Sequence, residues 1–148
     1  MKKPYKIIRD SIHGDIKLER IFQELLDSVE LQRLSSIKQL GLAHLVFPGA
    51  HHTRLEHSLG AYHISTMIAD VLGLSEDVAD HLFCASLLHD IGHGPFSHTL
   101  ESILRERYSV DHVDLTERLV LGTYDIFQNG EKTVLDHVET VASILESS

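Results

Sequence analysis

The most constraining feature of this chain is the segment His89-Asp90-Ile91-Gly92-His93-Gly94-Pro95-Phe96-Ser97-His98, which places three imidazoles and a carboxylate within ten residues. An apolar helical pattern runs into this segment through Leu88, and the glycines together with Pro95 favour an end to that helix. Adjacent residues on a regular helix point about 100° apart, so they converge on one ion only where the helix ends. The segment therefore predicts a helix whose C-terminal end presents His89 and Asp90 as metal donors.

The remainder of the chain is dominated by helical periodicity. Apolar spacing and capping residues predict helices over residues 20–26, 29–40, 54–72, 75–88 and 97–106. Capping-box-like starts at Asp111 and Thr133 predict two more helices. The alternation around His13-Gly14-Asp15 predicts a hairpin between Lys6 and Leu18. We therefore expect an all-α fold, a helical bundle with a small N-terminal β-hairpin.

Two of the predicted helices carry apolar stripes that we expect to face the core. In the helix over residues 54–72 this stripe consists of Leu55, Leu59, Ile64, Met67, Ile68 and Val71. The Ser75 hydroxyl is expected to cap the following helix, whose inward stripe consists of Val78, Leu82, Ala85 and Leu88.

Composition restricts the class of protein. With 148 residues and 43% hydrophobic content, the chain can bury the core of a single domain over residues 1–148. No apolar run reaches the roughly 18 residues of a membrane span, and no apolar segment follows the basic N-terminus as in a secretory signal. The single Cys84 fits a reducing compartment, so we expect a cytoplasmic protein without a membrane partner. The formal charge of −9 argues against direct nucleic-acid binding.

His57 supplies a third candidate ligand, one helix upstream of His89 and Asp90. A lone histidine on a helix is more often structural, but the surrounding Arg-x-x-His and His-Asp-x-Gly-His-Gly-Pro patterns together favour a metal site. Mixed imidazole and carboxylate donors predict a divalent ion (Mn, Fe, Mg, Zn, Co or Ni) without fixing its identity. Arg54 lies three residues before His57, on the same helix face, where its guanidinium can bind phosphate oxygens beside the ion.

Several motifs follow one another along the chain: Asp10-Ser11-Ile12-His13-Gly14, Gln32 to Gly41, Val46 to Ala50, Thr53 to Gly60, and His89 to His98. This succession resembles the deoxynucleoside triphosphate triphosphohydrolase branch of the HD-domain metal-dependent phosphohydrolases. The resemblance begins near Ile7, continues to about His98 and thins out after His112. It implies cleavage of a dNTP between the α-phosphorus and the 5′ oxygen, which releases deoxynucleoside and inorganic triphosphate.

Carried over residue by residue, the resemblance implies functional roles for ten residues. The metal ligands are His57, His89 and Asp90. Arg54 contacts the phosphates, and Gln39 with Leu40 lies beside the sugar, where deoxyribose is selected over ribose. The residues implied for the catalytic face are His93, His98, Glu101 and His112.

Proton transfer is the chemical step for which these catalytic residues would be needed. The departing 5′ oxygen needs a proton, and His98 is the candidate acid, with Glu101 three residues on to orient it. His93 and His112 then bind phosphate or handle protons. Structural alternatives are a solvated Glu101, a His112 that only occupies the first turn of a helix, a polar helix-end Gln39 and a core Leu40.

The chain departs from the family pattern in its C-terminal part. Family members are several hundred residues long and carry a fourth ligand, an aspartate followed by an acidic-Arg-aspartate run, which nothing after His112 resembles. Asp125 and Asp136 are the candidate substitutes, although a helix-face and a capping position explain them better. We therefore expect the N-terminal part of a longer architecture, whose uncovered apolar faces favour a homo-oligomer. The alternatives to a dNTP triphosphohydrolase are an HD phosphodiesterase or nucleotidase on another phosphate ester, and a nucleotide- or metal-binding module with little or no catalysis.

Overall fold

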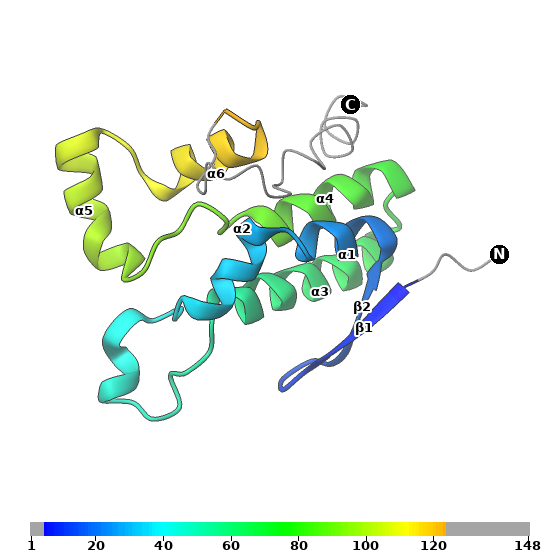
Figure 1. The fold of residues 1–148 in the computed structure, drawn as a ribbon. Helices are drawn as coiled ribbons and strands as arrows, with labels where there is room; N and C mark the ends of the chain where they lie inside the picture. The colour runs from blue at the N-terminus through cyan, green and yellow to red at the C-terminus, as the bar shows by residue number, and fades with distance from the viewer. Residues whose placement is uncertain (1–4, 124–148) are drawn as a thin grey trace.

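A computed structural model of the protein describes residues 5–123, apart from the side chains of Arg20, Ser97 and His98 (Figure 1). The described chain begins with an antiparallel hairpin of β1 (Tyr5–Asp10) and β2 (Gly14–Glu19). The Asp10 carboxylate closes the turn by accepting hydrogen bonds from the backbone N–H groups of Ile12 and His13, at 2.9 and 2.7 Å. The predicted hairpin is therefore confirmed, with a carboxylate holding its turn.

The hairpin leads into short helices, α1 (Arg20–Leu26), α2 (Val29–Gln32) and the 3₁₀ helix η1 (Arg33–Ser36). The helix predicted over residues 29–40 is therefore wrong in its second half. Ile37 is extended and its carbonyl accepts a 2.9 Å hydrogen bond from the Arg54 N–H. Tertiary pairing of this segment with the start of the next long helix overrides helical propensity.

A loop over residues 39–52 connects the two paired segments and contains the 3₁₀ helix η2 (Gly41–Leu45). Its base is closed by a β-bridge between Lys38 and Thr53 and by a 3.1 Å hydrogen bond from the Gln39 N–H to the His52 carbonyl. The two ends of the loop are thus fixed beside each other at the first residue of the following helix.

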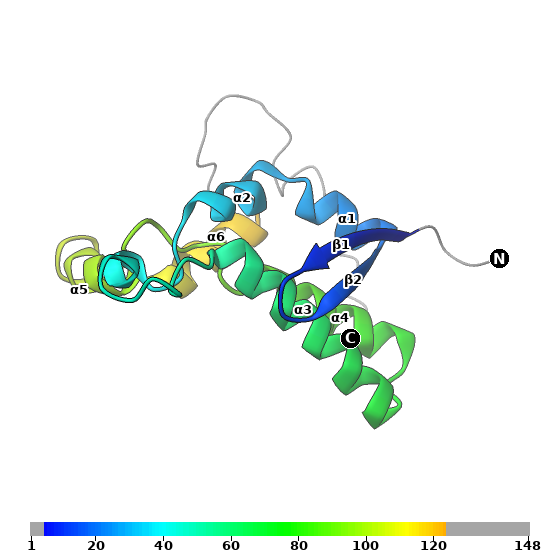
Figure 2. The same ribbon diagram turned by 90° about the horizontal axis from the view of Figure 1, so that it is seen from below.

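The two long helices, α3 (Arg54–Leu72) and α4 (Glu76–Leu88), pack as an antiparallel pair, which Figures 1 and 2 show from two directions. A capping box of Thr53 and Glu56 starts α3, and Gly73 ends it at φ 61°, a left-handed conformation that suits glycine. The start predicted for α4 is confirmed, but the Ser75 side chain makes no capping hydrogen bond there.

The apolar stripe predicted for α3 is largely wrong. Ile64, Met67 and Ile68 are about half exposed and Val71 is 85% exposed, whereas the buried face consists of Arg54, Ser58, Leu59, Tyr62, Ser65 and Ala69. The stripe of α4 is wrong in part, because Val78 and Ala85 are exposed and the buried residues are Ala79, Cys84, Leu87 and Leu88. Small residues such as Ser58, Ser65 and Ala69 on α3 and Ala79 on α4 are among the buried ones, so burial here does not follow side-chain hydrophobicity.

The C-terminal part of the described chain consists of α5 (Ser97–Tyr108) and α6 (His112–Val120). Figure 1 shows α5 extending away from the α3–α4 pair, while α6 returns to the end of α4. A capping box of Asp111 and Asp114 starts α6, as predicted; the helix predicted from Thr133 lies outside the described residues.

The core lies between the hairpin, the short helices and the α3–α4 pair. An aromatic cluster of Phe22, Tyr62 and Phe83 joins three of these elements, with ring centroids 5.2 to 5.8 Å apart. Fully buried aliphatic residues surround it, among them Ile16, Leu18, Leu31, Leu34 and Leu87. The fold is thus a helical bundle with an N-terminal hairpin, as predicted. None of the helices within residues 5–123 is long and apolar enough to cross a membrane.

Candidate metal centre

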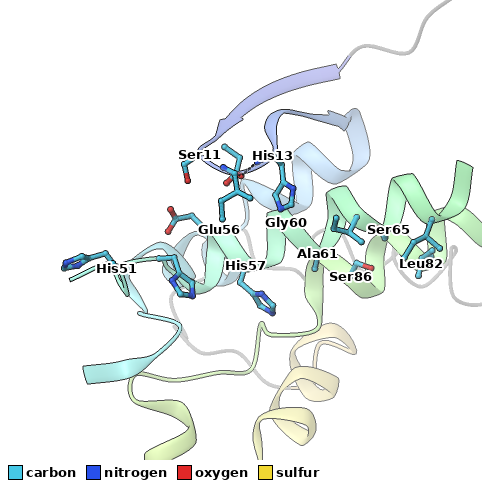
Figure 3. Close-up of a pocket in the computed structure, with 16 residues that line it drawn as sticks. Ser11, His13, His51, Glu56, His57, Gly60, Ala61, Ser65, Leu82 and Ser86 are labelled. Carbon is cyan, nitrogen blue, oxygen red and sulfur yellow. Dashed lines mark hydrogen bonds between the residues drawn. The ribbon is translucent and has the colours of Figure 1, made fainter. Parts of the chain in front are cut away.

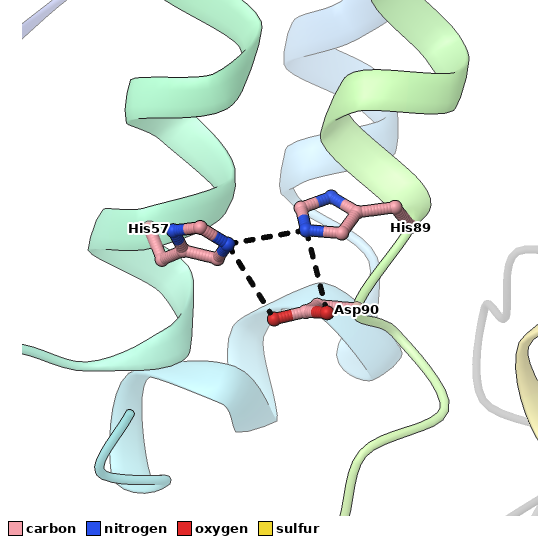
Figure 4. Close-up of side chains that lie close together, drawn as sticks. All are labelled: His57, His89 and Asp90. Carbon is pink, nitrogen blue, oxygen red and sulfur yellow. Dashed lines mark hydrogen bonds and ion pairs between the residues drawn. The ribbon is translucent and has the colours of Figure 1, made fainter. Parts of the chain in front are cut away.

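Three side chains converge where the start of α3 meets the end of α4 (Figure 4). The Nε2 atoms of His57 and His89 lie 3.2 Å apart. The Asp90 carboxylate approaches His89 Nε2 at 3.3 Å through Oδ1 and His57 Nε2 at 3.8 Å through Oδ2. The three ligands predicted from the sequence are therefore brought together as a candidate metal-binding group.

Local backbone geometry explains how neighbouring residues can converge. The last helical residue of α4 is Leu88, and beyond His89 the chain turns tightly, with hydrogen bonds from Ile91 N–H to Leu88 and from His93 N–H to Asp90. His89 Nδ1 lies 2.9 Å from the Ser86 carbonyl, so the ring donates there and directs Nε2 toward Asp90. A backbone bond to the far nitrogen is the usual device that fixes the tautomer of a metal-binding histidine.

The donor separations fit a single small ion. Bonds of about 2.1 Å place neighbouring donors about 3.0 to 3.4 Å apart in octahedral or tetrahedral geometry. The two Nε2 atoms, at 3.2 Å, and His89 Nε2 with Asp90 Oδ1, at 3.3 Å, lie in that range. His57 Nε2 approaches the other carboxylate oxygen, Oδ2, at 3.8 Å, so an ion bound through a single oxygen needs a small movement of one side chain. Two neutral nitrogens and one anionic oxygen suit a first-row divalent ion.

Electrostatics favour the protonation states that ligation requires. Burial raises the pKa of Asp90, but the positive charges that His89, His93 and Arg54 can carry outweigh burial and hold that pKa below its ordinary value. Burial is also the main cause that lowers the pKa of His57, against the attraction of Asp90. At neutral pH the site therefore offers an ionised carboxylate and a neutral imidazole.

Arg54 is buried at 1% exposure, and its Nη1 donates to Asp90 Oδ2 at 2.6 Å. The guanidinium thus neutralises the ligand carboxylate on the side away from His89. Its contact with substrate phosphates stays a prediction, since the structure places it against Asp90.

The catalytic candidates lie on the other side of Asp90. His93 is almost fully buried, with Nε2 3.5 Å from Asp90 Oδ1, and its ring stacks on His112 at a centroid separation of 3.9 Å. His112 Nδ1 binds the Glu101 carboxylate, which joins the first turn of α6 to α5. This bond argues against a merely solvated Glu101. The side chain of His98 lies outside the described residues, so its pairing with Glu101 stays a prediction.

The residues predicted to hold the sugar occupy the base of the 39–52 loop. Gln39 is half-buried, and Leu40 is 52% exposed, which excludes an ordinary core position for Leu40 in the described chain. Because Lys38 pairs with Thr53, both residues lie close in the fold to the start of α3, where Arg54 and His57 are found.

An open cleft of about 840 Å³ is lined by one of the three candidate ligands, His57 (Figure 3), and a second hollow of about 460 Å³ is lined by the other two, His89 and Asp90. His57 and Glu56 of α3 line it together with His51, His52 and the hairpin turn at Ser11. A smaller hollow of about 230 Å³ is lined by the remaining candidates, His93, Glu101 and His112. The ligand group therefore has open space beside it, as a substrate requires.

Two polar residues at this site had no predicted role. Arg33 donates from η1 to the backbone carbonyls of Ile91 and His93, the latter at 2.7 Å. The Thr116 hydroxyl of α6 accepts from the Gly92 N–H at 2.9 Å. Arg33 stands between polar and apolar neighbours in Leu31-Gln32-Arg33-Leu34, and Thr116 is an ordinary helix residue, so neither carried a signal in the sequence.

Comparison with known proteins agrees with this geometry. The model of the HD domain family matches residues 54–147. The protein MJ1154 of Methanocaldococcus jannaschii is 53% identical over 96 residues, which are 65% of this chain and 21% of the relative. Human deoxynucleoside triphosphate triphosphohydrolase SAMHD1 is 43% identical over 140 residues, 88% of this chain and 22% of the relative.

Solved structures give the same result. A phosphohydrolase from Bacteroides thetaiotaomicron superposes with a TM-score of 0.74 at 38% identity, over 81% of this chain and 31% of that structure. The chain spans about a sixth to a third of the length of the curated relatives it matches. HD domains depend on a divalent metal ion, and the ligand group described above supplies the donors for one. The family match covers more than half of the chain and includes all three converging ligands, so the chain belongs to the HD-domain phosphohydrolase family.

Proposed function

We propose that the protein hydrolyses deoxynucleoside triphosphates to deoxynucleoside and inorganic triphosphate. The observation that supports this most is the convergence of His57, His89 and Asp90 beside Arg54, in a chain 43% identical to a named dNTP triphosphohydrolase. The substrate is the finer part of the proposal, because this chain corresponds to 22% of that relative.

The proposed chemistry divides the work between the ion and the chain. A divalent ion, when bound, offsets the charge of the phosphates and activates a water molecule. Arg54 keeps Asp90 ionised and offsets its charge, so the local positive charge that a chain of net charge −9 needs in order to attract a triphosphate would come from the ion. His98 delivers a proton to the 5′ oxygen as its bond to the α-phosphorus breaks. His93, with Glu101 and His112, then binds a phosphate or carries protons.

Sugar selection is proposed for the base of the 39–52 loop. At that base Gln39 is half-buried and Leu40 is exposed, so neither residue is fixed in the core. A close fit at the 3′-hydroxyl with little room for a 2′-hydroxyl would favour deoxyribose over ribose.

Analysis of the released product tests the proposal. The purified chain is supplied separately with Mn, Fe, Co and Mg, and each dNTP and its ribonucleotide are followed by separation of triphosphate, pyrophosphate and monophosphate. We expect triphosphate and deoxynucleoside, lost in a His89→Ala, Asp90→Ala double variant and kept in His81→Ala, which changes a histidine elsewhere on α4. Monophosphate with pyrophosphate would instead indicate another phosphohydrolase activity, and metal-dependent dNTP binding without turnover would indicate a binding module.

A further inference from the structure

The backbone of the segment that carries the ligands is held from outside by side chains. We call residues 89–93 the HD loop. Three of its carbonyls, those of His89, Ile91 and His93, accept hydrogen bonds from side chains that lie elsewhere in the sequence. The Gly92 N–H donates to one of the same side chains. Buried backbone groups need partners, and here the partners come from two side chains distant in the sequence.

Arg33 holds the loop from the side of η1. Its Nη1 donates to the His93 carbonyl at 2.7 Å and its Nη2 donates to the Ile91 carbonyl. The guanidinium is planar, so binding two carbonyls at once fixes their separation and direction. One side chain thus determines the path of the chain on both sides of Gly92, directly after the ligand Asp90.

Thr116 holds the loop from the side of α6. Its hydroxyl accepts from the Gly92 N–H at 2.9 Å and donates to the His89 carbonyl at 3.3 Å. The contact is close, because a Cβ on Gly92 would lie 2.3 Å from the His112 carbonyl oxygen and 2.5 Å from the Thr116 backbone nitrogen. The loop is therefore seated against the first turns of α6, and the hydroxyl binds a ligand residue directly through its backbone.

The two side chains act on different parts of one short segment. Thr116 contacts His89 and Gly92, which flank Asp90 on either side, and Arg33 contacts the residues beyond it. The convergence of His89 and Asp90 depends on the backbone leaving the helical path at this point. Residues that fix this departure also fix how far the donor atoms lie from His57.

We propose that Arg33 and Thr116 are positioning residues of the metal centre, which set its affinity for a divalent ion by holding the HD loop. The inference rests on the proposed function only through the metal centre and requires no particular substrate. Neither residue is one of the three converging side chains. Groups that orient ligands from outside typically change metal affinity about 10- to 100-fold when they are removed.

Thr116→Val gives the sharpest variant, because valine has the shape of threonine and lacks the hydroxyl. Binding of Mn²⁺ to the full 148-residue chain is measured by titration calorimetry, together with the urea unfolding midpoint of the metal-free chain. We expect roughly tenfold weaker Mn²⁺ binding for Thr116→Val and near-normal binding for Thr116→Ser, which keeps the hydroxyl. Thr66→Val is the matched control, because the Thr66 hydroxyl donates to the His63 carbonyl within α3 and contacts no part of the HD loop.

Arg33→Lys provides a second test that keeps the charge and loses the two-point contact, with the exposed Arg9→Lys as its control. If Thr116→Val does not fold, the Mn²⁺ affinity of Arg33→Lys tests the inference in its place. Weaker Mn²⁺ binding without a comparable loss in the controls supports the inference. Unchanged Mn²⁺ affinity, with only a lower unfolding midpoint, overturns it. If the unaltered chain binds no Mn²⁺, the metal centre itself is wrong, and this outcome is separate from a failure of the variants alone.

Discussion

The two oxygens of the Asp90 carboxylate have different partners. Arg54 binds one of them, while His89 and His93 approach the other. A buried pair of this kind adds little net stability, because desolvation of both charges offsets their attraction. Breaking it is expensive, because the remaining charge is left buried without its partner. Arg54 therefore matters because it helps to keep Asp90 ionised, and not because the pair adds stability.

Replacing Arg54 by methionine is expected to lower the free energy of unfolding by about 3 kcal/mol, because Asp90 remains buried without a neutralising group. Urea denaturation of the metal-free chain measures this change. Arg9→Met, at a residue whose side chain is 78% exposed, is the control and should leave stability nearly unchanged. Similar unfolding curves for the two variants would contradict this account of the pair.

The candidate ligands could be predicted from the sequence because local patterns, together with the resemblance to the family, pointed to them. A helix that ends on glycine and proline exposes the adjacent His89 and Asp90, and Arg54 and His57 share one turn of a helix. Arg33 could not be predicted in the same way, since its two acceptors lie 58 and 60 residues away and are backbone carbonyls. Backbone acceptors leave no mark on residue identity, so only a three-dimensional structure identifies them.

The ends of α3 could be predicted from the sequence better than the face that it buries. The ends of α3 could be predicted because Thr53, Glu56 and Gly73 act within a few residues. The inward face of α3 could not, because the largest apolar groups, such as Met67 and Val71, lie on its exposed side. The buried face instead includes small residues such as Ser65 and Ala69, and hydrophobicity alone does not reveal which face a partner will approach.

The close approach of the HD loop to α6 predicts opposite outcomes for two neighbouring glycines. A Cβ at Gly92 would meet the backbone of α6, whereas a Cβ at Gly94 would meet nothing within 4 Å. Gly92→Ala is therefore expected to lower the free energy of unfolding by about 1 to 3 kcal/mol, since backbone atoms must shift. Gly94→Ala should unfold like the unaltered chain. Equal stability of the two variants, measured by urea denaturation, would show that α6 is not seated against the loop.

The start of α6 should respond to acid in a narrow range. The Asp111 carboxylate accepts from the backbone N–H groups of Val113 and Asp114 and from Arg105, and the pKa of Asp111 is lowered to about 2 from 3.8. A lowered pKa means that this stabilisation is complete above about pH 4 and is lost as the pH falls through about 2. An NMR titration of the Asp111 carboxyl carbon measures the midpoint, and Asp111→Asn should remove the acid transition of the α6 amide signals. A midpoint near 3.8 would contradict the capping interaction.

At the scale of the whole molecule, the ligands join α3 to the end of α4, so ion binding should stabilise the fold. With free Mn²⁺ at a hundred times its dissociation constant, the free energy of unfolding should rise by about 2.7 kcal/mol. Thermal unfolding with Mn²⁺, and again after addition of a chelator, measures the change. His57→Ala should show no such response. If the melting temperature of the unaltered chain changes neither with Mn²⁺ nor with the chelator, this result argues against the metal centre.

The exposed apolar side of the α3–α4 pair leads us to expect self-association. This side contains Ile64, Met67, Ile68, Val71 and Val78, all more than two-fifths exposed. Exposed apolar side chains on neighbouring helices favour association where they form one surface. Light scattering on the eluting chain should report a species larger than 16.7 kDa. Val71→Lys should shift it toward the monomer, while Tyr108→Lys, at the exposed end of α5, should not. A monomer at all concentrations would contradict the expectation.

The β-bridge between Lys38 and Thr53 separates the 39–52 loop, whose length can change, from the start of α3, which stays in place. Because both ends of the intervening loop are fixed at the bridge, its closure entropy changes slowly with length, by about 0.6 kcal/mol for each doubling. Insertions near Gly49 can therefore reshape the wall of the cleft at small thermodynamic cost. Arg54, whose N–H is bound to the Ile37 carbonyl just below the bridge, would stay in place. A scaffold of this kind permits new substrate preferences to arise by loop exchange while the ion-binding chemistry is inherited unchanged.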